Sequence, residues 1–172
     1  MRDATKTSET RRLGTVFLVA LSILAGANSA SGQAGRLAGL DEIRVVVESL
    51  SGVEDKTGLN RGDMTIHTLA LLKDKAPRLV INGTAESFIY VNTRLAINPV
   101  NSGKNDYYGA VWIGVYRPVI IKKTGLAISA MVWYRARGVT GTVDGANAYI
   151  QQTLDRILTQ FATEWSGDNP NP

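Results

Sequence analysis

Few residue types in this chain of 172 residues are suited to catalysis on their own. The sequence contains no cysteine and a single histidine, His67. Without thiols there is neither a cysteine nucleophile nor a thiolate metal site, and any histidine triad or metal cluster would depend on His67 alone. No Gly-x-Ser-x-Gly elbow, phosphate-binding lysine loop or helical zinc motif is present. We therefore predict no catalytic residue, no metal ligand and no cofactor.

Carboxylates offer the one remaining route to chemistry, because two of them suffice for glycoside hydrolysis. The candidates are the neighbouring pairs Asp41–Glu42 and Glu54–Asp55, and Asp106. They fall at strand starts or in loops, where acidic residues commonly serve solubility, and nothing in the sequence pairs them across the fold. An envelope hydrolase or a carbohydrate-binding protein, built on such carboxylates and on aromatic residues, is the alternative function that we carry forward.

Aromatic and arginine side chains alternate along the middle of the sequence and form its most distinctive set. At spacings of two residues they would project from one face of neighbouring strands. Both residue types are enriched at binding interfaces, because they combine large contact area with directional hydrogen bonds. We predict a binding surface made by Tyr90, Arg94, Trp112, Tyr116, Trp133 and Arg135, with Asn92, Met131 and Arg137 on the same face. The competing interpretation is that these groups stack on one another as ordinary cross-strand pairs, or that self-association or the tail of the chain covers them.

Alternation of apolar and polar residues predicts the strands that would carry this surface. The period of two is clear in residues 41–50, 88–98, 110–123 and 126–137, and a shorter strand is expected at 78–81. The glycine-rich residues 138–145 are expected to be a linker between the last strand and the helix that follows.

Two amphipathic helices are predicted to flank the central strands. The first would be capped by Asn60 and end near Lys75, with His67 as an ordinary surface or boundary residue. Its buried stripe would be Ile66, Leu69 and Ala70. The second would run from about Asp144 or Ala146 to Trp165, with one apolar stripe at helical spacing. That stripe is Ile150, Leu154, Ile157, Phe161 and Trp165.

The order strand, helix, four strands, helix predicts a two-layer α+β sandwich. Its sheet would be mostly antiparallel, with both helices on one face. Residues 35–165 would form this single domain, and residues 166–172 a flexible tail.

Residues 1–34 have the features of a secretory signal peptide. Arg11 and Arg12 precede the apolar residues 13–25, and a run of small residues follows. An apolar run of about 13 residues is shorter than the roughly 20 that span a bilayer, so we expect cleavage and no transmembrane anchor afterwards. The mature protein would be periplasmic or extracellular. Residues 1–34 hold four basic and two acidic side chains, so their removal lowers the formal net charge from +4 to +2, which argues against nucleic acid as a partner.

Two stretches carry a resemblance to known proteins. Leu40–Glu48, followed by Gly58-Leu59, and the ending Phe161–Pro170 resemble uncharacterised exported bacterial proteins. The element order is also similar to the amino-terminal domain of TolB-like periplasmic proteins and to curli-secretion-type assembly lipoproteins, although this chain lacks the lipoprotein cysteine. The resemblance implies a role in envelope assembly or protein contacts without catalysis. We therefore predict an exported, non-catalytic interaction or assembly module of the cell envelope, whose partner is an envelope protein or a second copy of the chain.

Overall fold

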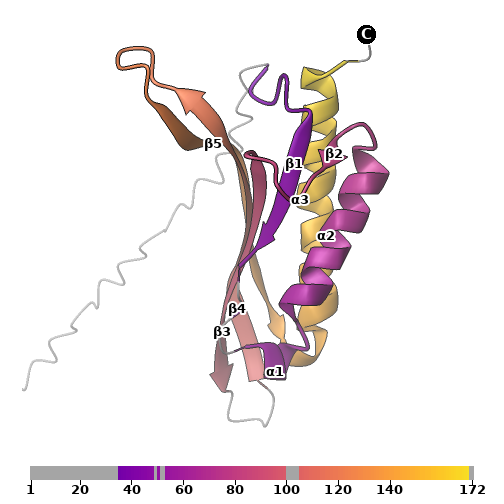
Figure 1. Ribbon diagram of the computed structural model, residues 1–172. Coiled ribbons are helices and arrows are strands. Elements are labelled where there is room, and N and C mark those ends of the chain that lie inside the picture. The colour runs from indigo at the N-terminus through magenta and orange to yellow at the C-terminus, as the bar shows by residue number, and fades with distance from the viewer. Residues whose placement is uncertain (1–34, 49, 51–52, 100–104, 171–172) are drawn as a thin grey trace, which may run out of the picture. The chain divides into compact units, whose positions relative to one another are not determined.

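The computed structural model describes residues 35–48, 50, 53–99 and 105–170 (Figure 1). The predicted signal peptide, residues 1–34, lies outside the described residues. The described chain forms five strands, three α-helices and one short 3-10 turn. In chain order they are β1 (Glu42–Val47), α1 (Glu54–Thr57), α2 (Arg61–Lys75), β2 (Val80–Ile81), β3 (Phe88–Pro99), β4 (Asn105–Ile120), β5 (Ala127–Thr142), η1 (Val143–Gly145) and α3 (Ala146–Asp168).

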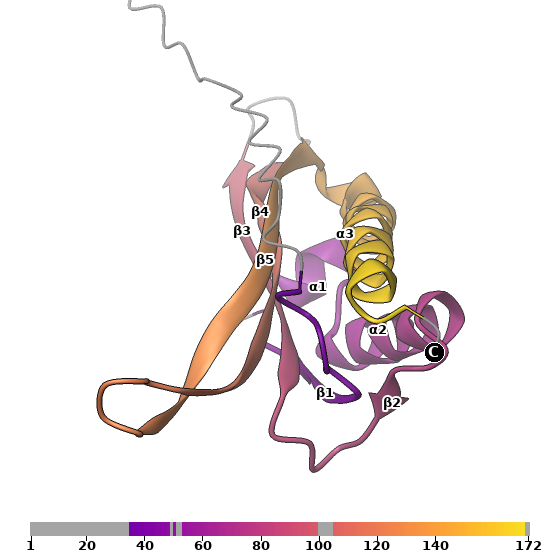
Figure 2. The same ribbon diagram turned by 90° about the horizontal axis from the view of Figure 1, so that it is seen from above.

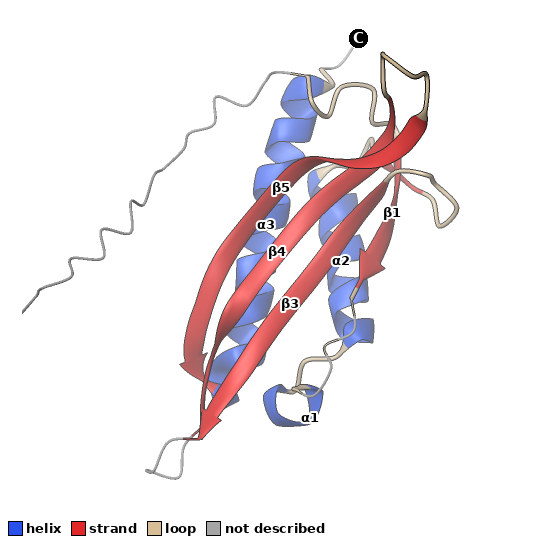
Figure 3. Ribbon diagram, turned by 90° about the vertical axis from the view of Figure 1, so that its left-hand side faces the viewer, coloured by secondary structure: helices blue, strands red, loops and turns tan. Residues whose placement is uncertain are grey.

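The strands form one sheet in the order β2-β1-β3-β4-β5. Strand β1 is parallel to both β2 and β3, whereas β3, β4 and β5 form an antiparallel meander. Figure 3 shows α2 and α3 on one face of this sheet, with the strands in front of them and the opposite face free of described helices. The predicted α+β sandwich with helices on one face is therefore confirmed.

Helix α3 supplies the largest apolar contribution to the core between the layers. All five residues of its predicted stripe, from Ile150 to Trp165, are at most 2% exposed. The helix is longer than predicted, because it continues to Asp168 and is capped by Asn169. The carboxylate of Asp168 accepts hydrogen bonds from the backbone N–H groups of Gly35 and Leu37, at 2.8 and 2.9 Å. Residues 166–169 are thus part of the folded domain, which corrects the predicted start of the flexible tail.

Helix α2 begins at the predicted cap but buries a different stripe. The Asn60 side chain accepts a hydrogen bond from the backbone N–H of Asp63 at 2.7 Å. The buried residues are Met64, Thr68 and Leu72, whereas Ile66 is 67% exposed, so the predicted stripe through Ile66 is wrong. The apolar residue types alone indicated the wrong face of α2, because the buried face includes a polar residue, Thr68.

Gly138 and Gly141 belong to strand β5, and Gly145 ends the 3-10 turn η1, which corrects the predicted linker at 138–145. Strand β5 continues to Thr142 and pairs Gly138 with Ala110 and Gly141 with Tyr107. A Cβ atom at Gly141 would lie 3.2 Å from the Tyr107 ring, so glycine here makes room for a buried tyrosine.

Within the part of the chain that the structure describes, no helix combines the length and the apolar character needed to cross a bilayer.

Candidate interaction surface

A β-bulge decides which side chains of β5 share a face with the predicted surface. Val115 pairs with Trp133, but the next residue, Tyr116, pairs with Met131, so Val132 is one extra residue in β5. An extra residue reverses the alternation of the strand on its two sides. Met131 therefore lies on the same face as Tyr116, while Trp133 turns to the face that the helices cover.

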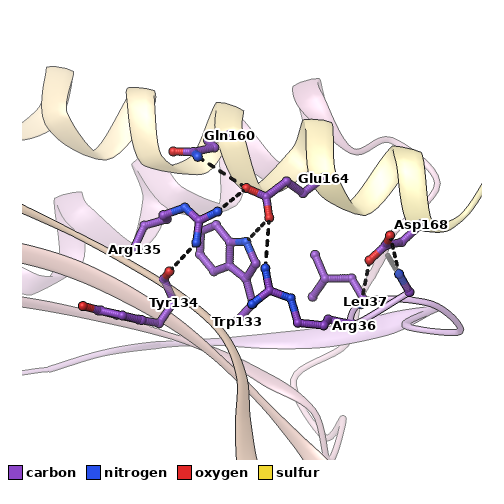
Figure 4. A network of polar contacts seen from close by, with 9 residues as sticks. Arg36, Leu37, Trp133, Tyr134, Arg135, Gln160, Glu164 and Asp168 are labelled. Carbon is purple, nitrogen blue, oxygen red and sulfur yellow. Dashed lines mark hydrogen bonds and ion pairs between the residues drawn. The ribbon is translucent and has the colours of Figure 1, made fainter. Parts of the chain in front are cut away.

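Trp133 and Arg135 are consequently not part of an exposed surface, and the prediction that placed them there is wrong. Trp133 is 1% exposed, and its ring meets Phe161 of α3 edge-on at a centroid distance of 5.4 Å. Its Nε1 donates a hydrogen bond to Glu164 Oε2 at 2.7 Å, and Arg135 Nη2 donates to Glu164 Oε1 at 2.7 Å. Figure 4 shows Glu164 at the centre of this network, with Arg36 and Gln160 at its sides. Trp133 and Arg135 thus join β5 to α3 through Glu164.

The other four predicted residues, Tyr90, Arg94, Trp112 and Tyr116, share the face without helices. Their strands lie side by side, because β3 pairs with β4 and sets Asn92 opposite Trp112. The ring centroids of Tyr90 and Trp112 are 5.2 Å apart, and those of Tyr90 and Tyr116 are 6.4 Å apart. Phe88 stacks on Tyr116 at 4.9 Å with an interplanar angle of 7°. We call Phe88, Tyr90, Trp112 and Tyr116 the aromatic cluster.

A glycine allows the aromatic cluster to close. Gly114 lies between Trp112 and Tyr116 on β4, and a Cβ atom there would be 3.2 and 3.3 Å from their rings and 3.0 Å from the Met131 sulfur. Those distances are tighter than ordinary van der Waals contact, so the rings and the thioether lean over the glycine. The cluster is therefore held by contacts among its own side chains.

Charged groups lie beside the aromatic cluster, along β1 and β3. Tyr90 donates a hydrogen bond to Glu48 Oε2 at 2.5 Å, and this bond, together with burial, raises the pKa of Tyr90 to about 12. Arg94 lies 3.9 Å from Glu48, but 80% of its side chain is exposed, so this ion pair is weak. The Arg44 guanidinium lies over the Phe88 ring at 4.8 Å.

Sequence reasoning missed three members of this surface. Phe88 is two residues before Tyr90, and the alternation of β3 was sufficient to include it. Tyr134, which is 53% exposed, shares this face because of the bulge, and the bulge leaves no mark in the sequence pattern. Arg44 joins this surface through the pairing of β1 with β3, which sets it opposite Phe88 and which alternation within a single strand does not reveal.

A cavity of about 330 Å³ lies next to Glu48 and Arg94, beyond the last β1–β3 pair, Val47 opposite Val91. Its lining residues are Glu48, Leu50, Val53, Asn92, Thr93, Arg94 and Leu95. Among the described side chains, this lining contains one carboxylate, that of Glu48. Across the described residues, no three His, Asp or Glu side chains gather closely enough to hold a metal ion.

The fold and surface define an α+β sandwich with one helix-covered and one helix-free sheet face. The sequence matches no protein-family model and no curated protein. Among solved structures, it is similar to a hypothetical protein of Chlamydia trachomatis, with 9% identity over 76% of this chain and 98% of that one and a TM-score of 0.43. It is also similar to a lipoprotein of Neisseria meningitidis, with 11% identity over 71% and 98% and a TM-score of 0.40. A third match, a minor lipoprotein of Acinetobacter baumannii, has 10% identity over 76% and 95% and a TM-score of 0.33. The TolB-like resemblance is not confirmed by these matches.

Proposed function

We propose that this protein is an exported, non-catalytic interaction module of the cell envelope, and that it binds a protein partner through the helix-free face of its sheet. The observation that carries the proposal is the aromatic cluster, flanked by the exposed side chains of Met131 and Tyr134, which are 48% and 53% exposed. No helix among the described residues covers this face (Figure 3). The leader-like residues 1–34 support export.

The composition of the helix-free face favours a protein as partner. Tyrosine, tryptophan, methionine and arginine are the residue types enriched at protein interfaces, where a ring of polar groups surrounds an apolar centre. Here the aromatic cluster is the centre, and Arg44, Glu48 and Arg94 are on its rim.

The stacking of the cluster also lowers the cost of binding. Rings that are already held against one another lose little rotamer freedom when a partner covers them. The contact of Phe88 with Tyr116 and the closure over Gly114 fix the rings before any partner arrives. This preorganisation is expected of a contact surface.

Site-specific crosslinking in living cells tests the proposal directly. A photoreactive amino acid is placed at Tyr134, on the helix-free face, and in a second variant at Ile66, an exposed residue of α2 on the other layer. We expect a discrete crosslinked species from position 134 and none from position 66. Its identity distinguishes an envelope protein from a second copy of the chain.

Substitution then separates binding from folding. Tyr134→Ala and Met131→Ala remove exposed side chains. With the photoreactive amino acid moved to another position of the helix-free face, both substitutions are expected to abolish the crosslink while leaving the circular dichroism spectrum unchanged. No crosslink from the helix-free face, or equal crosslinking from position 66, would contradict the proposal. Retention on purified peptidoglycan that Tyr134→Ala abolishes would favour the carbohydrate-binding alternative.

A further inference from the structure

The turn end of the β4–β5 hairpin exposes large apolar side chains away from the aromatic cluster. We call residues 118–128 the hairpin tip. Ile120 is 71% exposed, Leu126 58%, Ile128 40% and Ile121 38%. Figures 1 and 2 show the tip pointing away from α2 and α3 in both views. Scattered exposed apolar residues are normal. Here four lie within nine positions, and the pairing of Ile120 with Ala127 and of Val119 with Ile128 puts Ile120 and Ile128 on opposite faces, so the tip is apolar on both sides.

The tip is a well-formed turn that holds these side chains in solvent. The N–H of Ile121 donates to the carbonyl of Leu126 at 2.9 Å, and the carbonyl of Ile121 accepts from Gly125 at 2.8 Å and from Thr124 at 3.1 Å. Gly125 has a φ of +69°, a conformation that glycine adopts without strain. Below the tip, Arg117 Nη1 donates to the carbonyl of Ala38 at 2.9 Å. The hydrogen bonds of the backbone fix the turn, and its base is attached to the domain.

The hairpin is also strongly basic for a nearly neutral protein. Between Asp106 and Asp144 the sequence contains no acidic residue, and it contains five basic residues. They are Arg117, Lys122, Lys123, Arg135 and Arg137. Residues 35–172 have a formal net charge of only +2, so the rest of the mature chain is net acidic. Two of the five, Lys122 and Lys123, are exposed in the turn itself, between Ile121 and Leu126.

We propose that the hairpin tip inserts shallowly into an anionic lipid surface. Apolar side chains next to exposed lysines match the two layers of such a surface, in which acidic headgroups lie above the acyl chains. Strand residues rise about 3.3 Å each, so Ile120 and Leu126, within about three residues of the apex, reach the depth of roughly 5–10 Å at which interfacial segments bind.

Charge distinguishes this occupant from a second copy of the chain. Two tips in contact would bring Lys122 and Lys123 of both copies together, and like charges repel. An anionic bilayer offers the opposite sign over a wide area. The proposal is independent of the helix-free face, because it uses a different part of the hairpin and a different class of partner, so either can fail alone.

Flotation with lipid vesicles tests the proposal. The protein, purified in the form that the cell produces, is mixed with vesicles of phosphatidylcholine alone or of phosphatidylcholine with phosphatidylglycerol. We expect binding to the anionic vesicles that weakens as salt is added. Ile120→Ser with Leu126→Ser should reduce binding at least tenfold. Lys122→Gln with Lys123→Gln should reduce it by about thirtyfold, because each lysine near such a surface contributes about a fivefold gain.

The absence of cysteine provides a second readout with a matched control. Ile120→Cys and Ile66→Cys each introduce one thiol for an environment-sensitive fluorophore, at positions that are 71% and 67% exposed. We expect a blue shift on anionic vesicles from position 120 and none from position 66. Three results would overturn the proposal: no binding to anionic vesicles, binding that the tip substitutions leave unchanged, or a tip that binds an acidic protein and no lipid.

Discussion

The β4–β5 hairpin has a root, residues 105–117 and 129–142, with one face covered by the helices, and a tip that the helices leave bare. In the root, Val111, Ile113 and Trp133 are at most 1% exposed, whereas in the tip Ile120 and Leu126 are 71% and 58% exposed. The same strands, joined by the same ladder of hydrogen bonds, thus carry apolar side chains in two opposite environments. Within the hairpin, burial of apolar area stabilises the fold mainly in the root. The tip contributes little to folding, so its apolar residues are free to serve contacts with other molecules.

The largest predicted effect comes from the root. Trp133→Ala removes the ring that packs on Phe161 and the donor that binds Glu164. We expect a loss of about 3–5 kcal/mol in the free energy of unfolding, because truncating a buried aromatic ring leaves a cavity. Urea unfolding followed by circular dichroism measures the change.

Trp112→Ala is the matched control, since Trp112 lies on the helix-free face of β4, the strand that pairs with β5, and is only partly buried. It should cost clearly less than Trp133→Ala. Equal losses for the two tryptophans would show that both faces of the root are covered, and the contrast between them would fail.

The reversed placement of Trp133 and Arg135 shows where sequence periodicity stops being informative. Alternation predicted the faces of β3 and β4, because these strands pair without a shift from Phe88 opposite Tyr116 to Pro99 opposite Asn105. In β5 the same reasoning holds up to Met131 and fails after it, because the bulge inserts Val132 and no residue type announces a bulge. The α3 stripe was predictable because each of its members is apolar, whereas the α2 stripe includes Thr68.

A second effect, expected to be smaller, tests how closely the strands of the root approach. A Cβ atom at Gly109 would lie 2.0 Å from the backbone carbonyl oxygen of Arg94, so Gly109→Ala must push β4 away from β3. We expect a loss of about 1–3 kcal/mol, in the range of overpacked positions. Thermal unfolding measures it.

Gly83→Ala provides the comparison, because nothing lies within 4 Å of a Cβ atom there. It should change the stability by less than about 0.5 kcal/mol. A harmless Gly109→Ala would mean that the strands are further apart than the structure shows.

A third prediction concerns the aromatic cluster on the uncovered face of the root. The hydrogen bond to Glu48 raises the pKa of Tyr90 to about 12, above the value of 10.0 expected in the unfolded chain. The folded state therefore holds its proton more tightly, and this contribution to stability is present below about pH 10 and lost as the pH rises toward 12. Glu48→Gln should move the pKa of Tyr90 down toward its ordinary value, as followed by the ultraviolet absorbance of tyrosinate.

Tyr90→Phe is the control that assigns this titration, because it should remove the step near pH 12. If Glu48→Gln leaves that step in place, the Glu48 carboxylate does not determine the titration of Tyr90. The uncovered face would then be less preorganised than the contacts of the cluster indicate.

Sequence reasoning could not predict that the tip is exposed, and the reason differs from the one that hid the bulge. The turn at Lys122–Gly125 was predictable from its residue types, and so were the strands on either side. Whether Ile120 and Leu126 are covered depends on where α2 and α3 lie along the sheet, which no local pattern encodes. The four correctly placed residues of the helix-free face share this limit, since alternation assigns a face to Tyr90 or Trp112 but not the element that covers it.

The smallest effect on stability is expected at the tip. Ile120→Ser with Leu126→Ser should change the free energy of unfolding by less than about 0.5 kcal/mol, because both side chains are already largely in water in the folded state. Ile113→Ala in the root, the same residue type on the same strand, should cost about 2–5 kcal/mol. Urea unfolding of the two variants side by side measures the contrast. A tip variant that lost several kcal/mol would mean that the tip packs against the protein's own chain, and its apolar residues would then not be available to a lipid surface.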